Sequence, residues 1–200
     1  NIFPPDVLFV GKKPDLILDL ASGTGDVARI MAVRWPSAKV IASDPTIAMI
    51  NVGKEKTKAK NIQWMVGVAE AIELPDASVD IITMAFGFRN VEEGKRQKAI
   101  QEAYRVLRSG GVLSILELGL PKPGVAQKIY RVLLNYAMPA VAGAIAPKGP
   151  YKYLAGSIIA FPAPESVKRM FAKEGFIPFA PRPLSCGMSW LYVGKKREAN

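Results

Sequence analysis

The chain of 200 residues contains no histidine and one cysteine, Cys186. Without histidine, the chain lacks the side chain that most often acts as a general base near neutral pH and as a metal ligand. A single cysteine excludes a disulfide within the chain and a cluster of thiolate metal ligands. We therefore expect no metal site, and proton transfer must use carboxylates, tyrosines or water.

Long hydrophobic runs are also missing. The longest apolar stretch, 132–146, is interrupted by Asn135 and Pro139 and falls short of the roughly 20 residues that a spanning helix needs. No segment resembles a secretory signal peptide, and half of the residues are hydrophobic, enough for a large core. We expect one cytoplasmic domain, 1–200. Because the chain starts at Asn1, we also expect further residues before it in the natural protein.

The net charge of +10 raises the question of a nucleic-acid partner. However, the lysines and arginines are scattered over the whole sequence, whereas nucleic-acid binders more often show a basic stripe interleaved with exposed aromatic residues. We interpret the charge as a solvated basic surface and do not expect nucleic acid as a partner. Attraction to anionic lipid or to RNA stays open as an alternative.

Strand-like and helix-like patterns alternate along the chain, which predicts an α/β fold with a parallel sheet covered by helices on both faces. Expected strands are 16–20, 40–43, 62–66, 79–85, 112–118, 176–179 and 189–193, and expected helices are 26–34, 47–58, 92–108 and 164–173. Gly110 and Gly111 are expected to cap the helix 92–108. The segment 121–164 has helical patches and no clear strand; such an insertion usually lies over the carboxyl ends of the strands, where ligands bind.

A glycine loop, Asp19-Leu-Ala-Ser-Gly-Thr-Gly-Asp26, directly follows the first expected strand. Gly23-x-Gly25-x-x-Ala also satisfies the fingerprint of dinucleotide-binding folds, and Asp44 lies near the distance expected for a ribose contact. A nicotinamide-dependent dehydrogenase is therefore a competing interpretation.

Charge separates these two interpretations. Asp19 and Asp26 would repel the pyrophosphate of a dinucleotide at the start of the following helix. S-adenosylmethionine carries a sulfonium and an ammonium group and no phosphate, so an acidic glycine loop favours S-adenosylmethionine. We interpret Asp26 chiefly as a helix N-cap.

Five segments together resemble the ubiquinone/menaquinone biosynthesis C-methyltransferase family: 19–26, Phe-Gly-Phe-Arg-Asn-Val at 86–91, Tyr-Arg-Val-Leu-Arg-Ser-Gly-Gly at 104–111, Tyr-Lys-Tyr-Leu-Ala-Gly-Ser-Ile at 151–158 and Phe-Pro at 161–162. The resemblance extends from about Leu16 to Phe176. It implies a class I methyltransferase fold, Rossmann-like, with a mostly parallel seven-stranded sheet, one antiparallel closing strand and a helical lid after the fifth strand. It also implies S-adenosylmethionine as cofactor, S-adenosylhomocysteine as product and a lipophilic quinol as methyl acceptor.

The resemblance and the glycine loop together give a set of expected cofactor-binding residues. In the family, the loop 67–70 binds adenine; here Val68 replaces a polar residue, and Ala85 replaces a serine before Phe-Gly. The set is Asp19, Ala21, Ser22, Gly23, Thr24, Gly25, Asp44, Pro45, Val68, Ala69 and Ala85.

For the reaction itself, we expect Arg89 and Asn90 to orient the oxygens of the acceptor ring, with Arg89 also stabilising a developing phenolate. A structural salt bridge of Arg89 is the alternative, and Glu117 either touches the cofactor or braces a loop. Aromatic residues could line an apolar slot for the acceptor or form plain core: Phe88, Tyr130, Tyr136, Tyr151 and Tyr153.

Three further questions stay open at this point. The basic surface could rest on lipid headgroups, and the chain could form a homodimer. The methyl acceptor could be another small molecule or RNA. Finally, the chain could bind S-adenosylmethionine or NAD without turnover.

Overall fold

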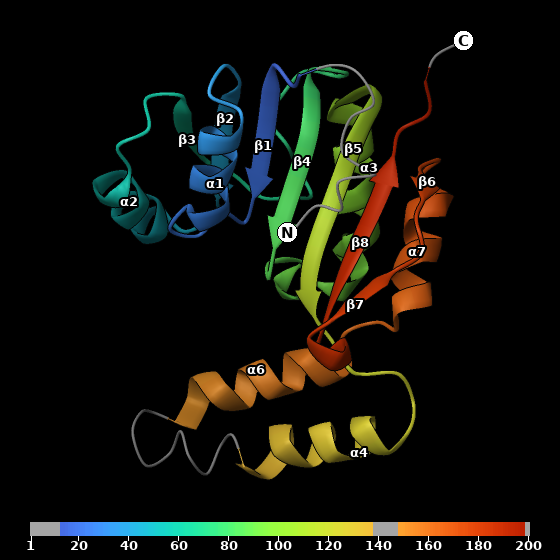
Figure 1. Cartoon of the computed structure of the whole chain (residues 1–200). Coiled ribbons are helices and arrows are strands. Elements are labelled where there is room, and N and C mark those ends of the chain that lie inside the picture. Colours follow the sequence, from blue (N-terminus) through green and yellow to red (C-terminus); the bar gives the residue numbers. More distant parts are fainter. Residues whose placement is uncertain (1–12, 138–147, 199–200) are drawn as a thin grey trace.

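The computed structural model describes residues 13–137 and 148–198 and has an α/β architecture around one sheet (Figure 1). The strand order is β3-β2-β1-β4-β5-β8-β6, with β7 also paired to β8. Strands β1 to β5 are parallel, and β8 is antiparallel to β5. The strands are β1 (Leu16–Leu20), β2 (Lys39–Asp44), β3 (Ile62–Val66), β4 (Val79–Ala85), β5 (Leu107–Leu118), β6 (Ile177–Pro178), β7 (Arg182–Leu184) and β8 (Ser189–Lys195).

Helices cover both faces of the sheet, as the alternating pattern predicted. The helices outside the insertion are α1 (Asp26–Arg34), α2 (Ile47–Lys56), α3 (Arg96–Val106) and α7 (Pro164–Lys173), with the 3₁₀ turns η2 (Phe88–Asn90), η3 (Glu93–Lys95) and η5 (Ser185–Gly187). Because side chains alternate along a strand, Ile17 and Ile81 pack toward α1, whereas Leu18 and Ile82 belong to the cluster that includes residues of α3 and α7. The sheet is therefore buried on both sides, which suits its parallel strands.

The insertion after β5 forms a separate helical layer. It contains α4 (Val125–Val132), the π-helical turn η4 (Leu133–Ala137) and α6 (Lys148–Ala160). Figure 1 shows this layer beyond the carboxyl ends of β4 and β5, in the expected position. No helix in the described part of the chain combines the length and the hydropathy needed to cross a membrane.

The closing edge of the sheet differs from the expectation in one respect. Seven strands were expected, but the edge beside β8 consists of two short pieces, β6 and β7, which makes eight. Pro178, Pro181 and Pro183 lie in or between these pieces, and proline has no amide hydrogen for a continuous ladder. Both pieces are antiparallel to β8, so among the described strands β8 is the one that runs against the others.

The expected helix cap at Gly110-Gly111 is wrong. α3 ends at Val106, and both glycines lie inside β5, where the pairing with β4 shifts register. Gly110 has φ +77°, and a Cβ atom on Gly111 would lie 2.8 Å from the Arg108 carbonyl oxygen. The two glycines therefore permit a bulge at the start of a strand, where the backbone approaches itself closely.

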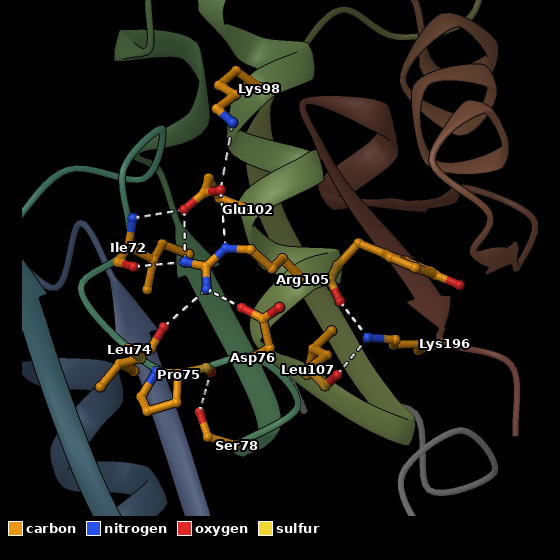
Figure 2. A network of polar contacts seen from close by, with 11 residues as sticks. Ile72, Leu74, Pro75, Asp76, Ser78, Lys98, Glu102, Arg105, Leu107 and Lys196 are labelled. Carbon is orange, nitrogen blue, oxygen red and sulfur yellow. Dashed lines mark hydrogen bonds and ion pairs between the residues drawn. The ribbon is translucent and has the colours of Figure 1, made fainter. Parts of the chain in front are cut away.

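A polar network joins α3 to the loop that follows β3 (Figure 2). The Arg105 guanidinium donates to Glu102 Oε2 at 2.8 Å, to the Ile72 carbonyl at 2.8 Å, to the Leu74 carbonyl at 3.0 Å and to Asp76 Oδ1 at 2.6 Å. Glu102 Oε2 also accepts the Ile72 amide hydrogen at 3.1 Å. One ion pair thus satisfies several backbone groups of the loop 72–76 and fixes its position against the helix.

We predict that Glu102→Gln destabilises the fold in a pH-dependent manner. The hydrogen bond from Arg105 lowers the pKa of Glu102 from 4.5 to about 2, although burial opposes this shift. Because the pKa is lower in the folded chain, the stabilisation is present above pH 4.5 and is lost as the pH falls toward 2. In urea denaturation at pH 7, the variant should lose roughly 1–3 kcal/mol of unfolding free energy.

The control is Glu165→Gln, an exposed carboxylate on α7 that lies 3.9 Å from Lys168 and should change stability by less than about 0.5 kcal/mol. A difference between wild type and Glu102→Gln that stays constant from pH 7 to pH 2 would contradict the role of the charge.

Candidate active site

A cavity of about 530 Å³ opens at the carboxyl ends of β1, β2 and β4. This is where the strand order reverses, because β1 has β2 on one side and β4 on the other. In such sheets the reversal leaves a crevice for ligands. The lining comes from the loop after β1 (Ala21, Gly23), the end of β2 with the following turn and the start of α2 (Asp44, Pro45, Thr46, Met49), the loop after β3 (Gly67, Val68, Ala69, Glu70) and the end of β4 with the connection that follows it (Met84, Phe86, Gly87, Asn90, Val91, Glu92).

Asp44 holds two of these segments together. Its Oδ2 accepts the amide hydrogen of Gly23 at 2.8 Å, and its Oδ1 accepts the amide hydrogen of Thr46 at 2.8 Å. The side chain is buried and lines the cavity. A carboxylate offers about four acceptor positions, so both oxygens can still accept hydrogen bonds from the hydroxyls of a ribose.

The charge of the lining agrees with a cationic ligand. Three carboxylates line the cavity, those of Asp44, Glu70 and Glu92, and no described lining residue is a lysine or arginine. A pyrophosphate would be repelled here, whereas a sulfonium and an ammonium group would be attracted. This supports S-adenosylmethionine over NAD, as the glycine loop indicated, although the carboxylates that carry the argument differ from the expected ones.

Asp19 lies beneath the glycine loop rather than in the cavity lining. The Thr83 hydroxyl donates to its Oδ1 at 2.6 Å, while Oδ2 is buried and has no hydrogen-bond partner among the described residues. Burial raises the pKa of Asp19 to about 7, although the hydrogen bond from Thr83 lowers it. A nearby cation would favour its charged form.

Only the first part of the glycine loop, which includes Ala21 and Gly23, lines the cavity. Gly23 lines the cavity, but Gly25 packs on Trp64 of β3, whose ring would lie 2.4 Å from a Cβ atom at that position. The Oγ atom of Ser22 is buried without a partner in the described chain. Thr24, Gly25, Ser22 and Ala85 stand beside the lining without belonging to it.

Asp26 does not cap α1, contrary to the interpretation from the sequence. The N-cap is Gly25, with φ 80°, and Asp26 is the first helical residue. The Asp26 carboxylate forms an exposed ion pair with Arg29. At this position a negative charge still interacts favourably with the helix dipole.

Arg89 pairs with the buried Glu117. Glu117 Oε2 accepts the Arg89 amide hydrogen at 2.9 Å, and Oε1 accepts both the Leu118 amide at 2.8 Å and Arg89 Nη1 at 3.2 Å. Burial raises the pKa of Glu117, and these hydrogen bonds oppose the rise. The salt-bridge alternative for Arg89 is therefore present, Glu117 braces a loop, and a direct contact of Arg89 with an acceptor stays a prediction.

Asn90 connects the cavity with the helical insertion. It lines the cavity, and its Oδ1 accepts the Tyr153 hydroxyl of α6 at 3.2 Å.

Phe88, by contrast, is buried in the core and packs edge-on against Phe161, with ring centroids 6.1 Å apart. Tyr130 lies against the small core of the insertion. The side chains of Tyr136 and Tyr151 are outside the described part of the structure.

Some lining residues were not predicted from the sequence. They include Met49, Phe86 and Glu92, whereas Glu70 was predicted only as part of the loop 67–70. Phe86 directly follows the carboxyl end of β4 and Glu92 lies in the same connection to α3, and that position was the available signal. Phe86 has φ +57°, a conformation that non-glycine residues adopt only when their surroundings impose it.

The sheet order, the single antiparallel strand and the acidic cavity define an S-adenosylmethionine-dependent methyltransferase of class I. Solved methyltransferases have the same fold. The chain superposes on an S-adenosylmethionine-dependent methyltransferase from Aquifex aeolicus with a TM-score of 0.64 and 20% identity, covering 90% of this chain and 81% of the other. It superposes on phosphoethanolamine N-methyltransferase 2 from Haemonchus contortus with a TM-score of 0.68 and 14% identity, covering 96% of this chain and 50% of the other.

The chain belongs to the ubiE/COQ5 methyltransferase family, whose model matches residues 7–196. A demethylmenaquinone methyltransferase from Thermus thermophilus is 38% identical over 192 residues, which cover 94% of this chain and 86% of the relative. A ubiquinone/menaquinone biosynthesis C-methyltransferase from Geobacter sulfurreducens is 35% identical over 185 residues, covering 90% and 72%. The family expected from the sequence is confirmed.

We predict that Asp44→Asn weakens S-adenosylmethionine binding. The substitution removes the charge and one acceptor while keeping the volume, so the dissociation constant should rise roughly 10- to 100-fold. Calorimetric titration measures this directly. Glu55→Gln, an exposed substitution on α2, is the matched control and should leave affinity unchanged.

Titration of wild type with NADH should show no binding; saturable NADH binding would contradict the role assigned to the acidic lining.

We predict a second pH effect, of opposite sign to that of Glu102. Because burial raises the pKa of Asp19 from 3.8 to about 7, the folded chain holds a proton that the unfolded chain has lost. This contribution to stability is full below pH 3.8 and decreases as the pH rises to about 7. The unfolding free energy of Asp19→Asn, relative to that of wild type, should therefore increase as the pH rises from 4 to 7. Urea denaturation followed by circular dichroism measures this difference. A parallel shift of both proteins across this range would show that Asp19 titrates normally.

Proposed function

We propose that this methyltransferase transfers a methyl group from S-adenosylmethionine to a ring carbon of a polyprenyl quinol, of the demethylmenaquinol or ubiquinol-precursor type, and releases S-adenosylhomocysteine. The observation that supports the proposal is that one cavity is lined both by residues around the end of β2, which are expected to bind the cofactor, and by Asn90 of the segment 86–91, which is expected to orient the acceptor. That segment carried the resemblance to quinone C-methyltransferases, and the relatives are named for this reaction. We also expect the chain to act without a metal ion.

The proposed reaction places modest demands on the protein. S-adenosylmethionine, when bound, supplies a methyl group that is already activated as a sulfonium. The carbon–sulfur bond breaks, a carbon–carbon bond forms, and the ring loses one proton to solvent. Holding the two reactants in line can contribute roughly 7–11 kcal/mol, so orientation of the ring is the main task of the residues around the acceptor.

Asn90 is suited to orient the ring. Its Oδ1 accepts the Tyr153 hydroxyl, which leaves the Nδ2 hydrogens to bind an oxygen of the acceptor. A ring hydroxyl loses its proton to make the carbon nucleophilic, and it regains a proton when the methylated carbon gives up its hydrogen, so that one proton leaves in total. Glu70 and Glu92 are carboxylates of the lining that could accept this proton through water.

Arg89 has a supporting role in this proposal. Its ion pair with Glu117, together with the hydrogen bond from its own amide, fixes the turn η2 that carries Asn90. Its buried Nε has no partner among the described residues and could hold a water molecule or a ring oxygen. Either contact would stabilise negative charge on the acceptor as the reaction proceeds.

The test of the function is a methylation assay with S-adenosylmethionine and a chemically reduced demethylmenaquinone that has a short side chain. We expect a quinol that is heavier by one methylene unit, together with an equal amount of S-adenosylhomocysteine, both measured by mass spectrometry. Tight binding of S-adenosylmethionine without methylation of any quinol would reject the acceptor class, and a salt-sensitive RNA gel shift would then favour RNA.

We predict that Asn90→Ala lowers kcat/KM for the quinol by roughly 10- to 100-fold, because one or two hydrogen bonds to the acceptor are lost. The dissociation constant for S-adenosylmethionine should change by less than about threefold, since truncation removes no charge from the lining. Asn51→Ala, an exposed substitution on α2, is the control and should be neutral. An equal loss of cofactor affinity and turnover would assign Asn90 to the cofactor instead.

A further inference from the structure

Helix α4 presents its apolar side chains to the solvent. Val125, Ile129 and Val132 of α4 and Leu133, the first residue of η4, are 74%, 65%, 58% and 48% exposed, and their spacing places them on one face of this helical segment. No residue of α4 is buried, whereas α1, α2, α3 and α7 each bury side chains. We call these four residues the α4 face. Packing within the described chain therefore does not explain the apolar character of this face.

The opposite side of this segment is the one that holds it in place. Tyr130 packs against a small cluster formed by Leu134 with Ala155 and Ile158 of α6. Gln127 donates to the Pro121 carbonyl at 2.9 Å. The α4 face consequently points away from α6, and Figure 1 shows α4 as the outermost layer, with α6 between it and the sheet.

The charge around the α4 face has one sign. Lys122, Lys128 and Arg131 are exposed on α4 or directly before it. The sequence 119–164 contains five lysines and arginines and no aspartate or glutamate. The acidic residues that balance basic ones elsewhere in the chain, such as those of α3 and the loop 72–76, have no counterpart in this segment.

We propose that the α4 face docks on the surface of an anionic lipid bilayer. A helix with exposed aliphatic residues on one face and basic residues beside it binds at the boundary between headgroups and acyl chains. Each basic residue adds attraction to anionic headgroups. A second copy of the chain fits less well, because the same basic residues would meet one another across a symmetric contact.

The position of this surface also suits a lipophilic acceptor, a point that depends on the proposed function. α6 connects the two sites, because it packs against the α4–η4 segment and because its Tyr153 binds Asn90 in the cavity lining. A quinol with its isoprenoid tail in the bilayer could thus reach the cavity along the insertion, without leaving the membrane surface completely.

The test is flotation of the purified chain with vesicles of phosphatidylglycerol or of phosphatidylcholine, at low and at high salt. We expect binding to phosphatidylglycerol that weakens with salt and little binding to phosphatidylcholine. The pair Ile129→Ser and Val132→Ser should weaken binding by about tenfold or more through lost apolar burial. The pair Lys128→Gln and Arg131→Gln should weaken it by about fivefold per charge, on phosphatidylglycerol only.

The matched control is the pair Ile30→Ser and Val33→Ser on α1, where the side chains are 53% and 79% exposed; binding should change by less than about twofold. Unchanged binding of the α4 variants, or no binding of wild type to phosphatidylglycerol, would overturn the proposal. So would a dimer, measured by light scattering, that the same α4 variants convert to a monomer.

The docking result is independent of the catalytic one. Vesicle binding needs neither cofactor nor acceptor, so it can succeed even if no quinol is methylated. Conversely, turnover of a water-soluble quinol should be the same in the α4 variants as in wild type. A loss of that turnover would assign the face to the active site and overturn its role as a membrane surface.

Discussion

The active site depends on one constraint of a parallel sheet, namely that its loops diverge where the strand order reverses. β1 lies between β2 and β4, so the loops that follow these strands border a crevice that no strand can fill. Asp44 links two of the strand ends through the Gly23 and Thr46 amides. The crevice therefore has a rigid polar floor before any ligand binds, and residues that are distant in the sequence share one wall.

Three buried carboxylates, those of Glu102, Glu117 and Asp19, show how hydrogen-bond partners separate a structural role from a functional one. Glu102 faces Arg105, which lowers its pKa and keeps it charged. Glu117 is completely buried, and its pKa is raised even though it accepts two backbone amides and the Arg89 guanidinium. Asp19 retains one oxygen without a described partner. The first two carboxylates use their hydrogen-bonding capacity to hold loops, whereas Asp19 can still respond to a positive charge bound above it.

Much of the fold could be predicted from the sequence, because the strands are short apolar runs and the helices are bounded by glycine and proline. The prediction for Gly110-Gly111 was wrong because two glycines after a helical pattern can either end the helix or form a bulge in the next strand. The local sequence is the same in both cases, and the pairing with β4 determines which structure forms. At the site, residues such as Gly23 and Asp44 were predictable from motif position. The inward turn of Phe88 and the pairing of Arg89 with Glu117 depend on tertiary contacts that no local pattern contains.

The helical insertion is best understood as a connector with two different surfaces. Its inner helix, α6, reaches the site through the hydrogen bond between Tyr153 and Asn90, a polar contact that fixes a direction. Its outer helix, α4, has no buried residue and meets the solvent with aliphatic and basic side chains. A lid that served only to exclude water from the cavity would gain from a polar outer surface, because exposed aliphatic side chains lower solubility without adding stability. The composition of α4 therefore favours a second partner, and the absence of acidic residues from 119–164 agrees with the proposal that this partner is a surface of negative charge.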